Sequence, residues 1–232
     1  MASRHRTSPG LVVLCALPPE AVAAWVGIRL FERRSPERAF GAWQGAVRGG
    51  RVRLTGMGPS RARRAASQLA SSLPDGLPVV VVGVGGALAE GFSAGNLVVA
   101  SQLGTADVGG DGELEVVRPP SVLDERSQLL AREVFEALSG RFPSTSFAPL
   151  LSAGRTARGS ERGVLARSGA VICDTESVWL ARLAERRPFA VVRSIVDTPE
   201  RELVSLQTVT GGVKGLQRLA AATEVIAEVL IR

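Results

Sequence analysis

The chain has 232 residues, of which 45% are hydrophobic and 22% are charged, and its formal net charge is +6. This length suits one large α/β domain better than two small ones, and the hydrophobic content suffices for a sizeable core. Two Cys and a single His disfavour a disulfide framework, a zinc site and His-dependent nucleophilic catalysis, so any acid–base chemistry falls to carboxylates.

The basic residues are scattered along the chain, and no block of them forms a tail, so we expect no nucleic-acid partner. The longest apolar stretch, "LPVVVVGVGGALAEGF", is too short to span a bilayer. Because no secretory signal is evident either, we expect a cytoplasmic protein with no transmembrane segment. No metal site and no cofactor are expected.

The elements alternate between strands and helices in the manner of an α/β fold. Residues 1–10 are expected to form a disordered tail, and no linker divides residues 11–232, which we interpret as a single domain. Apolar runs predict strands at 11–17, 77–86, 95–102, 147–154, 170–174 and 188–197, and a hairpin is predicted at 39–58. Amphipathic or capped stretches predict helices at 18–31, 58–73, 121–138, 159–169, 175–187 and 211–231.

Polar or glycine-rich residues stand where several of these strands end. Glu20 follows the first strand, the turn 83–86 ends the second, Glu176 follows "AVICD", and Asp197 ends "PFAVVRSIVD". Each has an ordinary structural explanation as a helix-start carboxylate or a turn residue. Ligands of open α/β sheets bind outside the carboxyl ends of the strands, however, so these residues together predict a site.

The ordered set of motifs resembles the nucleoside phosphorylase and nucleosidase superfamily. The matching segments are "CALPPEAV", "GVGGALAEGFSAGNLVVAS", "CDTESVWLA" and "RSIVDT". The resemblance implies a three-layer α/β/α sandwich around a central mixed, mostly parallel twisted sheet. The purine nucleosidase branch is the more similar one, and the C-terminal stretch from "DTESVWLA" to "GGVKGLQRL" is similar to hopanoid-biosynthesis nucleosidases, which remove adenine from adenosylhopane.

The resemblance also implies roles for individual residues. Asp197 is expected to protonate N7 of the purine, with desolvation at an apolar strand end keeping the carboxyl protonated. Glu176 is expected to bind the ribose hydroxyls, and Glu20 to position and deprotonate the attacking water. The further candidates for substrate binding are Val84, Gly85, Gly86, Thr156, Ala157, Arg158, Thr175 and Ser194.

Three residues depart from the family pattern and leave alternatives open. Thr175 replaces a Met beside the sugar, Val196 replaces a Ser that helps to aim the catalytic Asp, and Asn96 replaces an Asp. Altered specificity, or a nucleoside-binding protein of weak activity, therefore competes with an active nucleosidase.

Two further expectations concern the molecule that attacks the sugar, water or phosphate, and the oligomeric state. An ionised Glu20 would repel phosphate, which favours a hydrolase. Arg48, Arg61 and Arg155 nevertheless keep a phosphate-dependent phosphorylase open. The alternative substrates are methylthioadenosine and S-adenosylhomocysteine. The resemblance implies a homodimer or a higher homo-oligomer.

Overall fold

The computed structural model describes residues 10–34, 52–110, 112–199 and 207–231. Its eight strands are β1 (Val12–Cys15), β2 (Val52–Leu54), β3 (Val79–Ala87), β4 (Leu97–Val108), β5 (Leu114–Ser121), β6 (Ser146–Ala153), β7 (Ile172–Asp174) and β8 (Phe189–Asp197). The described helices are α1 (Pro18–Arg34), α3 (Pro59–Ser72), α4 (Glu125–Arg141), α5 (Ser160–Ala166), α6 (Ser177–Leu180), the 3₁₀ helix η1 (Ala181–Glu185) and α7 (Gln207–Leu230).

The sheet is mixed and mostly parallel, as predicted. Strands β2, β1, β3 and β8 run parallel to one another in that order, β4 pairs antiparallel with β8, and β6 and β7 continue in parallel from β4. Strand β7 also pairs antiparallel with the end of β3, so β3, β8, β4, β6 and β7 form a closed ring of pairings. Closure brings the ends of β3, β7 and β8 together, and this is where the candidate residues lie.

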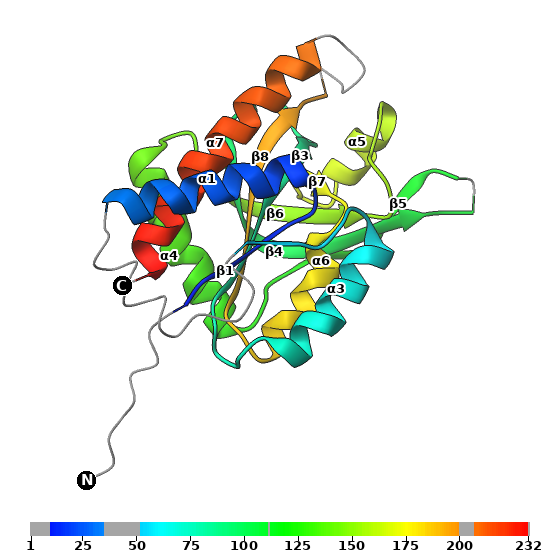
Figure 1. Ribbon diagram of the computed structural model, residues 1–232. Coiled ribbons are helices and arrows are strands. Elements are labelled where there is room, and N and C mark those ends of the chain that lie inside the picture. The colour runs from blue at the N-terminus through cyan, green and yellow to red at the C-terminus, as the bar shows by residue number, and fades with distance from the viewer. Residues whose placement is uncertain (1–9, 35–51, 111, 200–206, 232) are drawn as a thin grey trace.

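Helices cover both faces of the sheet, which confirms the layered α/β architecture (Figure 1). Helices α1, α4 and α7 pack on one face against residues such as Val13, Val80 and Val192, and α3, α6 and η1 pack on the other against Val12 and Val81. Consecutive strand residues therefore enter opposite cores. This explains why the residues of β1 and β3 are consecutive apolar residues and glycines rather than alternating apolar and polar ones, and why β8 is apolar apart from Arg193, Ser194 and its last residue, Asp197.

Several boundaries differ from those predicted. The predicted helix 175–187 is one short α-helix followed by the 3₁₀ helix η1, which ends just before Pro188. The helix predicted from residue 121 begins at Glu125, because the side chain of Asp124 caps it by accepting hydrogen bonds from the backbone N–H groups of Arg126 and Ser127.

Two strand predictions also need correction. Strand β5 was not predicted, because the two prolines in "LEVVRPPS" and its exposed face obscure the strand pattern. Strand β2 pairs in parallel with β1, while the first half of the predicted hairpin lies outside the described residues.

Candidate active site

The carboxylate of Glu20 is held by backbone N–H groups in the first turn of α1. Its Oε2 accepts hydrogen bonds from Ala16 N at 3.0 Å and Leu17 N at 2.8 Å, and its Oε1 accepts one from Val84 N at 2.8 Å. The side chain is buried, with 2% of the residue exposed. These bonds explain why the short loop after β1 ends in Glu: the acid closes its own loop and ties it to β3.

Strand β3 reaches the site through glycines that leave room for neighbouring side chains. A Cβ on Gly83 would lie 1.9 Å from Arg193 Nη1, and a Cβ on Gly86 would lie 2.7 Å from Asp197 Oδ1. The register between β3 and β8 shifts between Gly85 and Gly86. The Gly83–Gly86 segment, predicted as a turn, is the last part of strand β3, and it lies against side chains of β8 and α1 that a larger residue would displace.

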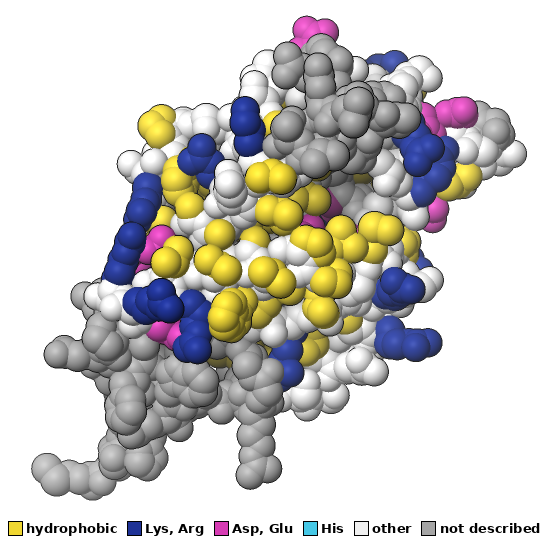
Figure 2. Space-filling view, turned by 45° about the horizontal axis from the view of Figure 1, so that its top comes forward, with side chains coloured by type: hydrophobic (Ala, Val, Ile, Leu, Met, Phe, Trp, Pro, Cys, Tyr) yellow, Lys and Arg dark blue, Asp and Glu magenta, His cyan; other side chains and the backbone are white. Residues whose placement is uncertain are grey.

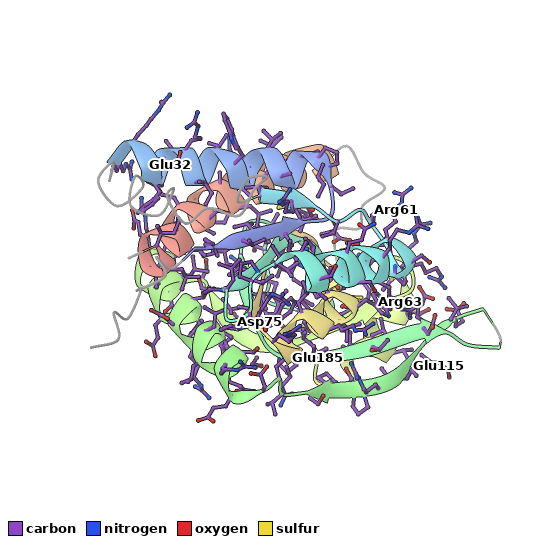
Figure 3. The ribbon with its side chains drawn as sticks, turned by 60° about the horizontal axis from the view of Figure 1, so that its bottom comes forward. Glu32, Arg61, Arg63, Asp75, Glu115 and Glu185 are labelled. Carbon is purple, nitrogen blue, oxygen red and sulfur yellow. The ribbon has the colours of Figure 1, made fainter. Side chains whose placement is uncertain are left out.

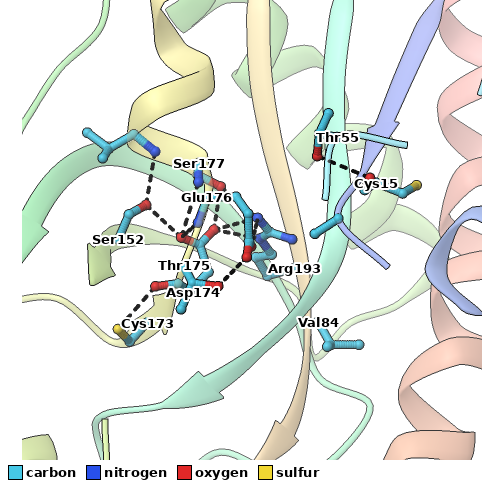
Figure 4. A network of polar contacts seen from close by, with 12 residues as sticks. Cys15, Thr55, Val84, Ser152, Cys173, Asp174, Thr175, Glu176, Ser177 and Arg193 are labelled. Carbon is cyan, nitrogen blue, oxygen red and sulfur yellow. Dashed lines mark hydrogen bonds and ion pairs between the residues drawn. The ribbon is translucent and has the colours of Figure 1, made fainter. Parts of the chain in front are cut away.

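A buried cluster that the sequence did not reveal supports this region, and we call it the arginine framework: Ser152, Asp174, Ser177 and Arg193 (Figure 4). Arg193 Nε donates to Asp174 Oδ2 at 2.8 Å, and Arg193 Nη2 lies 2.6 Å from the same oxygen. Ser152 donates to Asp174 Oδ1 at 2.6 Å, and the hydroxyl of Ser177 donates to Oδ2. The framework links β6, β7, α6 and β8 through charge-assisted hydrogen bonds.

Arg193 remains charged although it is completely buried. Burial by itself lowers the pKa of a guanidinium, but the carboxylates of Asp174, Glu176 and Glu20 raise the pKa of Arg193 above its ordinary value. Its Nη1 lies beside Gly83 and has no hydrogen-bond partner among the described residues. A fixed positive charge therefore stands among the acidic side chains of the site.

Glu176 lies at the N-cap position of α6, one residue outside the helix turn in which it was predicted. Its Oε1 accepts hydrogen bonds from Gly58 N at 3.1 Å and from the Thr175 hydroxyl, and its Oε2 lies 3.5 Å from Arg193 Nη2. Burial raises the pKa of Glu176, while the positive charge of Arg193 opposes that rise.

Two features around Glu176 were not predicted from the sequence. The "TGMGPS" loop supplies Gly58 to the site, and its signal was a pair of glycines, Gly56 and Gly58, which both adopt positive φ. The hydroxyl of Thr175, which replaces the family's Met, donates a hydrogen bond to Glu176 that a Met cannot make.

Asp197 ends β8 and is buried, but its surroundings are not the apolar ones that were expected. Its Oδ2 forms an ion pair with Arg162 Nη2, and both residues are almost fully buried. Arg162 Nη1 also donates to the carbonyl oxygen of Ala87 at 2.7 Å, at the end of β3. An adjacent guanidinium favours the ionised carboxylate, so the expectation of a carboxyl kept protonated by an apolar environment needs correction.

The remaining predicted substrate-binding residues do not contact the three acids in any of the interactions described above. Ser194 is buried, but its Oγ is 3.6 Å from where a Cβ on Gly215 would lie, so it faces α7 rather than the side of β8 that carries Arg193. Thr156 and Arg158 are exposed in the loop between β6 and α5, and Ala157 packs into a small core beneath it.

Of the arginines considered as phosphate ligands, one is paired with a carboxylate, one is exposed at the surface, and one lies outside the described residues. Arg155 donates to both carboxylate oxygens of Glu161, at 2.8 and 2.5 Å, and this pairing holds the pKa of Glu161 at about 2. Arg61 is exposed on the outer side of α3, as is Arg63 (Figure 3). Arg48 lies outside the described residues.

Exposed apolar side chains occur close in the chain to residues of the site. Val22, two residues after Glu20, is 61% exposed, and Leu54 and Met57, just before Gly58, are also exposed. Figure 2 shows hydrophobic side chains gathered across the middle of one face, with basic side chains toward its margins.

Other classes of site find little support in the part of the chain that the structure describes. Cys15 and Cys173 are free and buried, and burial together with the Glu20 carboxylate raises the pKa of Cys15 to about 12. No group of three or more His, Cys, Asp or Glu side chains in the described ranges is arranged to hold a metal ion. None of the described helices is long and apolar enough to cross a membrane.

Comparison with known proteins identifies the family and shows which solved structures share the fold. A family model described as "Phosphorylase superfamily" matches residues 11–226. No curated protein matches the sequence. Futalosine hydrolase of Helicobacter pylori strain 26695 is 17% identical, with a TM-score of 0.70 over 95% of this chain and 98% of that one.

Two nucleosidase structures are similar to the same extent. A 5′-methylthioadenosine/S-adenosylhomocysteine nucleosidase from S. pneumoniae, solved with a transition-state inhibitor, is 16% identical with a TM-score of 0.66 over 95% of this chain and 99% of that one. The nucleosidase from Neisseria meningitidis with methylthio-immucillin-A is 17% identical, with a TM-score of 0.62 over 93% and 99%. At these identities the likeness establishes a shared fold.

Proposed function

The chain belongs to the phosphorylase superfamily, and from this premise we propose that it hydrolyses the N-glycosidic bond of a 5′-substituted adenosine and releases adenine. The observation that carries the proposal is the convergence of three buried acids, Glu20, Glu176 and Asp197, on the glycine-rich end of β3. The solved structures of this fold named above include a futalosine hydrolase and two nucleosidases.

Each acid has a distinct part in the proposed reaction. Positive charge develops on the sugar as the glycosidic bond breaks, as in glycoside hydrolysis, and the leaving purine needs a proton. Glu176, at the α6 N-cap, is suited to accept hydrogen bonds from the ribose hydroxyls and to stabilise that charge. Glu20 positions and deprotonates water, and Asp197 delivers a proton toward N7 of the base.

Water is the proposed acceptor rather than phosphate. Glu20 puts negative charge beside β1 and β3, where a phosphate dianion would have to approach. Arg155, a candidate phosphate ligand, is committed to Glu161. Among the described residues, the phosphorylase alternative would have to bind phosphate with the exposed Arg61 or with Arg193, whose Nη1 has no hydrogen-bond partner but which stands among the acids Asp174, Glu176 and Glu20.

A bulky apolar 5′ substituent, as in adenosylhopane, is the substrate that we propose. Val22 and Met57 are exposed apolar residues close in the chain to Glu20 and Gly58, and Leu54 is exposed on β2; apolar surface on these segments would suit such a group better than the small substituent of methylthioadenosine. The same surface is also suited to contact a second copy of the chain in a homo-oligomer. A second candidate function is nucleoside binding with weak turnover, which the Arg162–Asp197 ion pair favours because it opposes protonation of the acid.

The decisive experiment is an adenine-release assay with adenosine, methylthioadenosine, S-adenosylhomocysteine and adenosylhopane, with and without phosphate. We expect hydrolysis without phosphate and the highest kcat/KM for adenosylhopane. Asp197→Asn and Glu20→Gln should each lower kcat by about 10²–10⁴-fold while nucleoside binding persists. Asp75→Asn, at an exposed position, is the matched control.

Three outcomes would contradict parts of the proposal. Phosphate-dependent formation of ribose-1-phosphate would assign the protein to the phosphorylases. Nucleoside binding without turnover would favour the binding protein. Wild-type rates in Asp197→Asn would remove that residue from the mechanism.

A further inference from the structure

Arg162 is a buried cation for which the three-acid mechanism has no use. It lies on the short helix α5 with 3% of the residue exposed, and its guanidinium reaches the ends of two strands. Nη1 donates to the Ala87 carbonyl oxygen at 2.7 Å, and Nη2 pairs with Asp197 Oδ2. The side chain thus connects β3 to the carboxylate that ends β8.

The surroundings are built closely around this pair. A Cβ on Gly86 would lie 3.1 Å from Arg162 Nη1 and 2.7 Å from Asp197 Oδ1, so only glycine leaves room there. A buried ion pair is in general weak evidence of a role in stability, because desolvation of the two charges offsets their attraction. The location of this pair on the proposed proton donor points instead to a role in the reaction.

We propose that Arg162 is a positioning residue that fixes the orientation of the Asp197 carboxylate and holds it ionised. Asp197 therefore becomes the acid required for cleavage only when it binds a proton in spite of its ion pair with Arg162. This inference rests on the proposed function, because it assigns Arg162 a task in protonating the leaving base. Arg162 itself transfers no proton, since a guanidinium stays charged at all working pH values.

Among the described residues, Cys173 on β7 is a titratable group that faces the pair from a neighbouring element, and its electrostatic interactions include both Arg162 and Asp197. Burial, with a smaller contribution from Asp174, raises the pKa of Cys173 above its ordinary value, which favours the neutral thiol. Substitution of Arg162 therefore removes the positive charge that faces Asp197 from α5.

The expected pH dependence follows from the charges. Cleavage needs the proton on Asp197, and the guanidinium favours its loss, so turnover should decline as pH rises. Protonation of the general base Glu20 should separately lower turnover in acid. Without the guanidinium, a buried carboxyl keeps its proton to higher pH because desolvation disfavours the charged form. The decline in activity should then move to higher pH.

The test compares kcat–pH profiles of the wild type, Arg162→Gln and Arg162→Lys, with Arg167→Gln at the exposed end of α5 as the matched control. We expect the midpoint of the decline to rise by about one pH unit or more in Arg162→Gln, and to stay near that of the wild type in Arg162→Lys and the control. A uniform loss of kcat in Arg162→Gln, with an unmoved midpoint, would mean that Arg162 is only structural.

A second measurement needs no turnover and covers the case in which Arg162→Gln fails to fold. The ¹³C resonance of the Asp197 carboxyl, assigned by its absence in Asp197→Asn, is followed by NMR as the wild-type protein is titrated. It should titrate below about 3.9, the ordinary pKa of an Asp side chain. Titration at or above that value would overturn the inference, whereas a protein inert toward every nucleoside but with such a lowered pKa would overturn only the proposed function.

Discussion

Substitution of Asp174 by Asn tests whether the arginine framework holds the site together. Asn keeps the shape of Asp174 and can accept the hydrogen bond that Ser152 donates at 2.6 Å, but it removes the charge opposite Arg193. Both side chains of the ion pair are 0% exposed. Removing one partner of such a pair typically costs about 3–5 kcal/mol, because an uncompensated charge stays buried.

This cost is large compared with the stability of a typical domain, which is about 5–15 kcal/mol. For a chain of 150–250 residues, each kcal/mol shifts Tm by about 2–4 °C, so we expect Tm to fall by about 6–20 °C. Thermal unfolding followed by far-UV circular dichroism measures this. Glu185→Gln is the control, since the side chain of Glu185 is 70% exposed (Figure 3) and pairs with Arg182, which is exposed as well; such pairs contribute about 0–1 kcal/mol.

A double substitution shows whether the loss comes from the pair itself. Asp174→Asn combined with Arg193→Met removes both charges, so its cost should be smaller than the sum of the two single costs. If Asp174→Asn melts within about 2 °C of the wild type, or if the two single costs simply add, the framework does not carry the stabilisation assigned to it.

Other positions give sharper local tests. Gly83→Ala should displace Arg193, because the new Cβ would lie 1.9 Å from its Nη1, so both adenine release and Tm should fall. The control is Gly140→Ala, where the new Cβ meets open space; it should leave adenine release unchanged and leave Tm unchanged or slightly raised. Thr175→Met should raise kcat/KM for small 5′-substituted adenosines relative to a large apolar one, and an unchanged ratio would remove the argument for a bulky substrate. The pKa of Glu161 is lowered in the folded state, so the wild type should lose stability as pH falls from 4.5 to about 2, and Glu161→Gln should not show this loss. If the free energy of unfolding of the two proteins depends on pH in the same way over this range, the reasoning is wrong.

The order of the elements and the positions of the acids were open to prediction because both are local properties of the sequence. Strands β1, β3 and β8 are buried on both faces, so their apolar residues follow one another instead of alternating with polar ones, and the strands are easily recognised even though Arg193 and Ser194 interrupt β8. Glu20 and Asp197 follow or end such runs, and strand ends that share an edge of a sheet bring such residues together. The resemblance to nucleosidases added roles to positions already selected in this way.

The charges around those acids depended on contacts between distant parts of the chain. In the sequence, Arg193 interrupts an apolar strand and Arg162 belongs to a polar helix, and neither pattern distinguishes a solvated arginine from a buried one. Their partners Asp174 and Asp197 are 19 and 35 residues away. Burial and pairing at such separations follow from packing, not from local periodicity.

The sequence by itself thus determined the α/β class, the two-faced burial of the strands and the acids that end them, because each follows from the solvation of a short segment. Only the tertiary structure decided that β7 closes a ring onto β3, that Ser194 faces α7, and that the proposed proton donor carries a guanidinium beside it. The physical reason is electrostatic: the charge state of a buried carboxyl depends on whatever lies within a few ångströms of it, and the fold brings those groups from helices and strands far apart in the chain.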